Sequence, residues 1–160
     1  MPGRLLNVPL HRMQQEADCL AACAAMELDY IGHRLAYSDL LRLLGVGEFG
    51  APASRIARLA SRGVSVEYGE GTWEMIETFV DDDQPVIVLV RTGELPYWQG
   101  VDTFHSVVIV GYDQTRVFVN DPYFEDAPKT VMRGDFLLAW LEMGYRYAVI
   151  SIRSTEPANR

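Results

Sequence analysis

The chain has 160 residues, of which 49% are hydrophobic, and it carries a formal net charge of −8 with a pI near 4.8. This length and composition predict one folded domain over residues 1–153 and a flexible tail at residues 154–160. The negative charge argues against a nucleic-acid partner, which would favour a basic face. The sequence shows neither a signal peptide nor a run long enough to cross a bilayer, so we expect a cytoplasmic protein without a membrane partner.

The first half of the chain is predicted to be mainly helical. Residues 5–10 read as a short extended lead-in, and residues 19–31 read as a helix capped by Asp18 and stopped by Gly32. No polar side chain occurs from residue 20 to residue 26, so this helix is predicted to be buried. Ser38 is predicted to cap a second helix over residues 39–44. A third helix is predicted at residues 53–62, with an apolar stripe of Ile56, Leu59 and Ala60.

The second half changes to β-branched runs bounded by Gly, Asp and Pro. Strands are predicted at residues 64–66, 85–90, 105–110, 116–119 and 147–152. Helices are predicted from a Thr72 cap to residue 80 and over residues 135–143. Helices followed by strands with tight turns indicate an α+β fold with a mainly antiparallel sheet. The aromatic loop at residues 92–103 is long enough to border a functional site.

Cys19 is the candidate nucleophile. It stands directly after Asp18, at the amino end of the predicted buried helix, where the helix dipole favours a thiolate over a thiol. Cys23 lies one turn further along the same apolar segment and is interpreted as a small core residue. Two cysteines four residues apart on one helix are poorly placed for a disulfide.

A cysteine nucleophile requires a base, and His105 is the candidate because it opens an apolar strand directly after the aromatic loop. His11 and His33 are interpreted as solvated residues. The turn at residues 112–115 predicts a hairpin that returns the chain beside His105 near residues 120 and 121. Asp121 is therefore the candidate that orients the histidine, and Asn120 is the second choice.

A zinc site is the alternative interpretation of the same residues. Cys19 and Cys23 share one helix face and would need His105 or His11 as a further ligand. A Cys-x-x-x-Cys pair without a second closely spaced pair of ligands is a weak metal motif. We therefore predict neither a metal nor an organic cofactor.

Two stretches of the sequence resemble the bacteriocin-processing peptidases, papain-like domains that cut leader peptides after a double glycine. The first contains Val8-Pro9, Gln14-Gln15, Asp18-Cys19 before an Ala-rich helix, and Tyr30-Ile31-Gly32. The second runs from His105 to Tyr112 and on to Asn120-Asp121-Pro122, in the same order as in that family. The resemblance covers roughly residues 8–123.

This resemblance implies a papain-like cysteine peptidase fold, in which a buried helix bearing the nucleophile packs on the sheet. It implies Cys19 as nucleophile, His105 as base, Asp121 as the orienting group, and an upstream glutamine that donates to the oxyanion. The family's glutamine position, six residues before the cysteine, holds Met13 here, so Gln14 and Gln15 are the candidates. Leu20 stands where the family has a glycine.

The expected function is hydrolysis of peptide bonds through a Cys-His-Asp triad, with leader-peptide processing as the activity implied by the resemblance. The expected partner is a peptide or protein substrate. Two alternatives use the same scaffold. An acyltransferase or deamidase would use the same triad with another nucleophile or amide. An inert peptide-binding domain would fit Leu20 and the shifted glutamine.

Overall fold

A computed structural model describes residues 3–153 of the chain, so the tail predicted at residues 154–160 lies outside the described residues. The first half contains strand β1 (Arg4–Leu5), 3-10 helix η1 (Glu16–Asp18), helix α1 (Cys19–Tyr30), helix α2 (Tyr37–Leu44) and 3-10 helix η2 (Ala53–Arg62). The second half contains β2 (Val64–Glu70), α3 (Trp73–Asp81), β3 (Val86–Arg91), η3 (Thr92–Glu94), η4 (Pro96–Trp98), β4 (Phe104–Tyr112), β5 (Arg116–Asn120), β6 (Lys129–Met132), α4 (Arg133–Leu141) and β7 (Arg146–Ile152).

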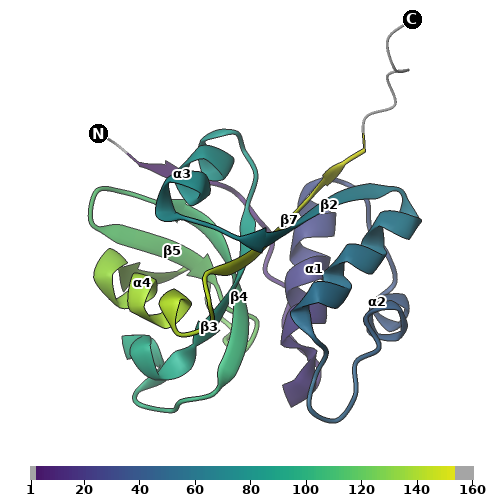
Figure 1. The fold of residues 1–160 in the computed structure, drawn as a ribbon, viewed down its shortest axis with the longest axis horizontal. Coiled ribbons are helices and arrows are strands. Elements are labelled where there is room, and N and C mark those ends of the chain that lie inside the picture. The colour runs from purple at the N-terminus through teal and green to yellow at the C-terminus, as the bar shows by residue number, and fades with distance from the viewer. Residues whose placement is uncertain (1–2, 154–160) are drawn as a thin grey trace, which may run out of the picture.

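One twisted sheet organises the molecule. Its strands follow the order β2-β7-β3-β4-β5-β6, and β1 pairs with β4. The paired strands are antiparallel throughout, which confirms the predicted α+β class and its mainly antiparallel sheet. Figure 1 shows α1, α2 and η2 on one side of the sheet, and α3 and α4 on the other. None of the described helices is long and apolar enough to cross a membrane.

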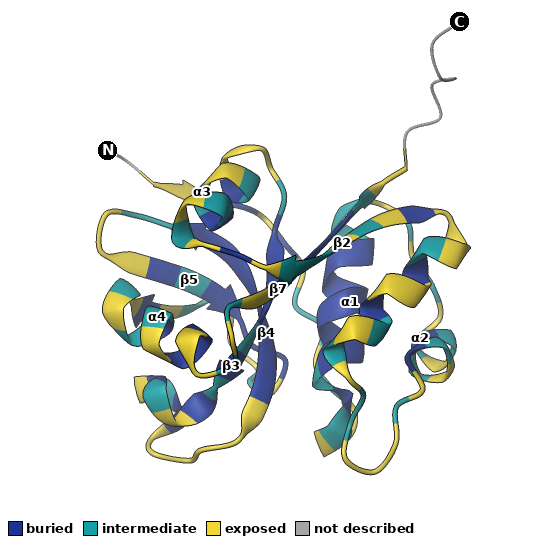
Figure 2. Ribbon diagram, viewed as in Figure 1, coloured by how far each residue is buried: buried dark blue, intermediate teal, exposed yellow. Residues whose placement is uncertain are grey.

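Helix α1 begins at Cys19, as predicted, and every residue from Leu20 to Leu28 is buried (Figure 2). The predicted Asp18 cap is wrong. Asp18 ends η1 with φ −94° and ψ 8°, so its backbone is not extended as a capping residue requires. Its carboxylate instead accepts from the Gln15 N–H at 3.2 Å and the Tyr37 hydroxyl at 3.3 Å.

The next two helices differ from the predictions in detail. Helix α2 begins at Tyr37 with Ala36 as its N-cap, so Ser38 lies inside the first turn and does not cap it. Residues 53–62 form a 3-10 helix, not an α-helix. Ile56 and Leu59 are its fully buried side chains, and their spacing of three residues matches the three residues per turn of a 3-10 helix.

The second half follows the prediction with longer strands. Thr72 caps α3 by accepting from the Met75 N–H at 3.2 Å, as expected. Strand β2 continues to Glu70, because β7 pairs with it over its whole length. Strand β6 was not predicted; its side chains are mostly not buried, and its pairing with β5 defines it. Helix α4 begins at Arg133, before the predicted start.

The register of the β4–β5 hairpin differs from the prediction. Asn120 lies opposite Val108 rather than beside His105, because the turn that pairs Tyr112 with Val117 lies further along the chain than predicted. The register shift between Ile109 and Gly111 places an extra residue in β4 and brings Asn120 one residue nearer to His105 than an unbroken register would. Asp121 therefore approaches His105 from beyond the end of β5, not from a position directly opposite it.

Candidate active site

The structure brings the candidate nucleophile and the candidate base to one cavity. Cys19 is the first residue of α1, and His105 is the second residue of β4. Both line a cavity of about 630 Å³, together with Leu20, which forms part of the wall beside Cys19. The thiol therefore lies at the amino end of a buried helix and remains open to a ligand on one side.

His105 is paired with Asp121 below this cavity. The His105 Nε2 lies 2.7 Å from the Asp121 Oδ1, and both side chains are buried. Because Nε2 faces the carboxylate, Nδ1 is the ring nitrogen left for the Cys19 thiol, which lines the same cavity and contributes to the raised pKa of the imidazole. The structure thus brings the three predicted residues together, with His105 bonded to Asp121 and lining one cavity with Cys19.

The electrostatics favour an ion pair. Burial opposes ionisation of Cys19, but hydrogen bonds and the charge of His105 lower the pKa of the thiol below its usual value. Burial also opposes the charge on His105, yet the hydrogen bonds to Asp121 and Cys19 raise the pKa of the imidazole to about 9. The pKa of Asp121 is lowered, because its bonds to His105 outweigh its burial. At neutral pH these shifts favour a thiolate beside an imidazolium.

Two aromatic side chains complete the surroundings of Asp121. Its second oxygen, Oδ2, accepts from the Tyr97 hydroxyl at 2.7 Å and from the Trp98 Nε1 at 2.9 Å. The Tyr123 N–H donates to Oδ1 at 3.0 Å. Tyr97 and Trp98 belong to the loop at residues 92–103, which was predicted to border a site. Their hydrogen bonds to Asp121 were not predicted. The aromatic content of that loop was the available signal.

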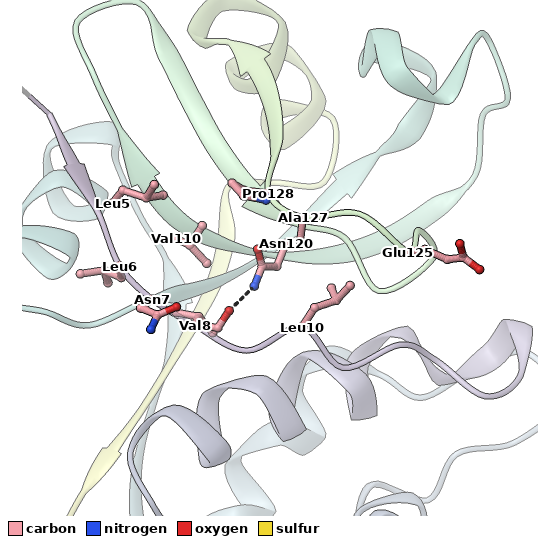
Figure 3. Close-up of a pocket in the computed structure, with 10 residues that line it drawn as sticks. All are labelled: Leu5, Leu6, Asn7, Val8, Leu10, Val110, Asn120, Glu125, Ala127 and Pro128. Atoms are coloured by element: carbon pink, nitrogen blue, oxygen red, sulfur yellow. Dashed lines mark hydrogen bonds between the residues drawn. The ribbon is translucent and has the colours of Figure 1, made fainter.

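Asn120, the second choice for orienting the histidine, points elsewhere. Its Nδ2 donates to the Val8 carbonyl at 3.0 Å and lines a different pocket of about 380 Å³. Figure 3 shows this pocket between the lead-in segment and the loop that carries Pro128. Asn120 therefore anchors the lead-in, and Asp121 is the residue that meets His105.

The two candidate glutamines lie outside the cavity at Cys19. Gln14 and Gln15 are exposed, and neither is among the residues that line it. Gln15 lines an adjacent hollow instead. Met13, at the position where the family has its glutamine, is fixed by its backbone N–H, which donates to the Pro122 carbonyl at 3.0 Å. The role of either glutamine at an oxyanion remains a prediction.

The other two histidines are held by neighbouring groups and are not simply solvated. The His11 Nε2 lies 2.8 Å from the Asp29 Oδ2, and the His33 Nε2 lies 2.8 Å from the Arg62 carbonyl oxygen. Both side chains are partly buried. Neither histidine lines the cavity at Cys19.

Cys23 is fully buried, as predicted, and it adds a residue that sequence reasoning missed. Its Sγ donates to the Ser106 Oγ at 3.6 Å, and Ser106 also lines the cavity at Cys19. Burial and the nearby Cys19 raise the pKa of the Cys23 thiol well above its usual value. Within residues 3–153, no group of three or more His, Cys, Asp or Glu side chains is arranged to hold a metal ion.

Comparison with solved structures shows the same fold in peptidase domains. A protein described as a candidate C39-like peptidase from Bacillus anthracis superimposes with a TM-score of 0.80 at 21% identity, over 97% of this chain and 100% of that one. The peptidase domain of Streptococcus ComA, a bifunctional ABC transporter of a quorum-sensing pathway, gives 0.73 at 18%, over 92% and 100%. A double-glycine-motif protease from an AMS/PCAT transporter, solved with its leader peptide, gives 0.72 at 17%, over 94% and 95%.

These similarities confirm the predicted papain-like peptidase fold, in which the buried helix that begins at Cys19 packs on an antiparallel sheet. A search of curated proteins found no match. The family profile matches residues 5–148, which is most of the chain. The chain therefore belongs to the Peptidase_C39 like family.

Proposed function

We propose that this protein is a cysteine peptidase in which Cys19 is the nucleophile, His105 the acid and base, and Asp121 the group that orients His105. The observation that carries the proposal is the buried His105–Asp121 hydrogen bond beside the cavity that His105 and Cys19 line together. Residues 1–153 would act as one peptidase domain. A cytoplasmic location would keep both thiols reduced.

The reaction follows from the ion pair. The Cys19 thiolate attacks the peptide carbonyl carbon, and the backbone N–H groups at the start of α1 donate to the developing oxyanion. The His105 imidazolium gives its proton to the leaving amine, which breaks the C–N bond and leaves a thioester on Cys19. Water then attacks the thioester while His105 takes up its proton, releasing the acid and the free thiolate.

The substrate we propose is a peptide, and leader-peptide processing is the specific activity. The protease from the AMS/PCAT transporter has been solved with a leader peptide, which supports this class of substrate. The cavity at Cys19 is bordered by Phe49 and Phe104, which are 96% and 68% exposed. Exposed aromatic rings beside a reactive thiol provide apolar contacts for peptide side chains.

Two other functions use the same residues. A catalytically inert peptide-binding domain is favoured by the position of Gln14 and Gln15, which lie outside the cavity. Leu20, which forms part of the wall beside Cys19, favours it too. An acyltransferase or deamidase would share the triad, and its acyl-enzyme would be resolved by an amine or formed from a side-chain amide.

The test is incubation of the purified protein with a synthetic leader-type peptide that contains a double glycine, followed by mass spectrometry. We expect cleavage by the wild type and by a Ser65→Ala control on the exposed edge of β2, and none by Cys19→Ala. Added glycine amide would give an amide product if the protein is an acyltransferase. Binding of the intact peptide without any cleavage would contradict a peptidase and support the inert domain.

A further inference from the structure

We propose that Ser106 is a further catalytic residue, whose hydroxyl donates a hydrogen bond to the Cys19 sulfur and is held in that orientation by the thiol of Cys23. This inference rests on the proposed function, because it concerns the same thiolate. It also gives Cys23 a task beyond filling the core.

The position of Ser106 places it against both cysteines. It follows His105 directly on β4, has an exposed fraction of 1%, and lines the cavity that contains Cys19. Its Oγ lies 3.6 Å from the Cys23 Sγ, one helical turn below Cys19. Helix α1 packs along β4, so the hydroxyl lies between the strand and the first two turns of the helix.

The direction of the hydroxyl proton follows from what each group can donate. A serine hydroxyl has one proton to donate and two lone pairs that accept. Cys23 is fully buried and remains a protonated thiol, because burial raises its pKa well above the usual value. Its S–H donates to the Ser106 Oγ, so the proton of the serine remains available for another acceptor. Ser106 and Cys19 line the same cavity, and Ser106 lowers the pKa of the Cys19 thiol, so the Cys19 sulfur is the acceptor we propose.

In the proposed arrangement the Cys19 sulfur has donors on two sides. The His105 ring lines the cavity with Cys19 on one side, and Ser106 lies on the buried side, next to Cys23. The remaining ionisable groups around the cavity are Glu16 and Glu48, whose negative charges would oppose a thiolate. A buried neutral donor favours the thiolate without adding a charge that must itself be desolvated.

The decisive experiment measures the rate of iodoacetamide alkylation of Cys19 against pH, with the modified residue identified by mass spectrometry. Loss of a hydrogen bond to a charged group predicts that Ser106→Ala raises the pH midpoint by about one unit. At a pH below both midpoints the alkylation rate then falls about tenfold. Ser65→Ala, which removes an exposed strand hydroxyl, is the matched control and should leave the midpoint unchanged.

The Cys23 variants test the orienting thiol separately. Cys23→Ala removes the donor to Ser106 and should raise the midpoint by about half a unit, whereas Cys23→Ser keeps a donor and should restore it. In the Ser106→Ala background, Cys23→Ala should have no further effect, because the group it orients is gone. If Ser106→Ala does not fold, the difference between Cys23→Ala and Cys23→Ser decides the question alone.

The outcomes separate this inference from the proposed function. A depressed wild-type midpoint that does not move in Ser106→Ala would overturn the role of Ser106 and leave the Cys19–His105 pair intact. Equal midpoints for Cys23→Ala and Cys23→Ser would overturn the role of Cys23. A wild-type midpoint near that of a free thiol, about 8.5, would instead overturn the ion pair on which the proposed function depends.

Discussion

Two histidine–aspartate pairs in this protein have almost the same length and very different surroundings. The His11 Nε2 lies 2.8 Å from Asp29, and the His105 Nε2 lies 2.7 Å from Asp121. The first pair is partly exposed, and Arg34 contacts the same aspartate. The second pair is buried and adjoins the Cys19 thiol. The contact alone therefore does not identify a catalytic pair.

The two carboxylates differ in the charged groups that hydrogen-bond them. Hydrogen bonds from Arg34, and then from His11, lower the pKa of Asp29 to about 2, so its charge is shared with an arginine at the surface. Asp121 has His105 as its cationic neighbour, and its other oxygen is held by neutral donors from Tyr97 and Trp98. The charge of Asp121 is therefore directed onto one imidazole.

Replacing each histidine in turn should give the largest difference between the two pairs. His105→Ala should reduce turnover of a cleaved peptide by about 10³-fold or more, because the acid and base of the reaction is lost. His11→Ala removes a pair of almost the same length and should leave turnover within about twofold. Steady-state cleavage of one peptide by both variants measures the contrast. Equal losses in the two variants would mean that His105 acts only as a structural residue.

Replacing each aspartate in turn tests whether only the Asp121 carboxylate contributes to turnover. Asp121→Asn should reduce turnover by roughly 10- to 100-fold, less than the ~10⁴-fold cost of this change in a serine triad, because the cysteine–histidine pair is already charged. Asp29→Asn should have no measurable effect on turnover. The kinetics should be accompanied by circular dichroism of each variant. Full activity of Asp121→Asn would contradict an orienting role for the carboxylate.

Two tyrosines with equal hydrogen bonds test the effect of burial. Tyr97 donates to Asp121 and Tyr112 donates to Asp81, both at 2.7 Å, but the second pair is exposed. Tyr97→Phe should lower the free energy of unfolding by about 1.5–3 kcal/mol, because a buried carboxylate loses a donor. Tyr112→Phe should cost less than about 1 kcal/mol, because water replaces the bond. Urea denaturation at neutral pH measures both, and equal costs would contradict the effect of burial.

Glu27 is a buried carboxylate that has no histidine as its partner among the described residues. Glu27 on α1 is fully buried; its Oε1 accepts from the Ile150 N–H at 3.1 Å, and no described group hydrogen-bonds its Oε2. Burial raises the pKa of Glu27 well above its usual value, so it stays protonated in the folded protein at pH values where the unfolded chain has lost the proton. The free energy of unfolding should therefore fall by about 1.4 kcal/mol per pH unit above the unfolded pKa of about 4.3, up to the raised folded pKa.

Glu27→Gln removes this pH dependence while keeping the acceptor for Ile150. The variant should gain stability relative to the wild type as the pH rises from 5 to 8. Urea denaturation at several pH values measures the difference between the two proteins. A constant difference over this range would contradict a raised pKa for Glu27.

Much of the fold was predictable because local signals and tertiary structure agree. The apolar run after Cys19 specified a buried helix, and the Thr72 cap and the β-branched runs specified α3 and the central strands. The order of Cys19, His105 and Asp121 along the chain, the elements predicted to carry them and the family resemblance together supported the proposal that they meet. These signals are properties of short segments, so a single sequence displays them.

The remaining features depend on distant parts of the chain. Strand β6 has little apolar pattern of its own and is defined by its pairing with β5, and the bulge before Gly111 is a feature of the pairing between β4 and β5. The contacts of Trp98 with Asp121 and of Ser106 with Cys23 join segments that are far apart in sequence. No local pattern encodes such contacts.

The pH dependence of Cys19 alkylation, in the wild type and in His105→Ala, is the most direct test of the buried pair. We predict a wild-type midpoint well below the free-thiol value of about 8.5, because the charge of His105 favours the thiolate. In His105→Ala the midpoint should move up towards that value. A wild-type midpoint near 8.5 that does not move when His105 is lost would show that the ion pair does not exist, and the inert binding domain would then replace the peptidase.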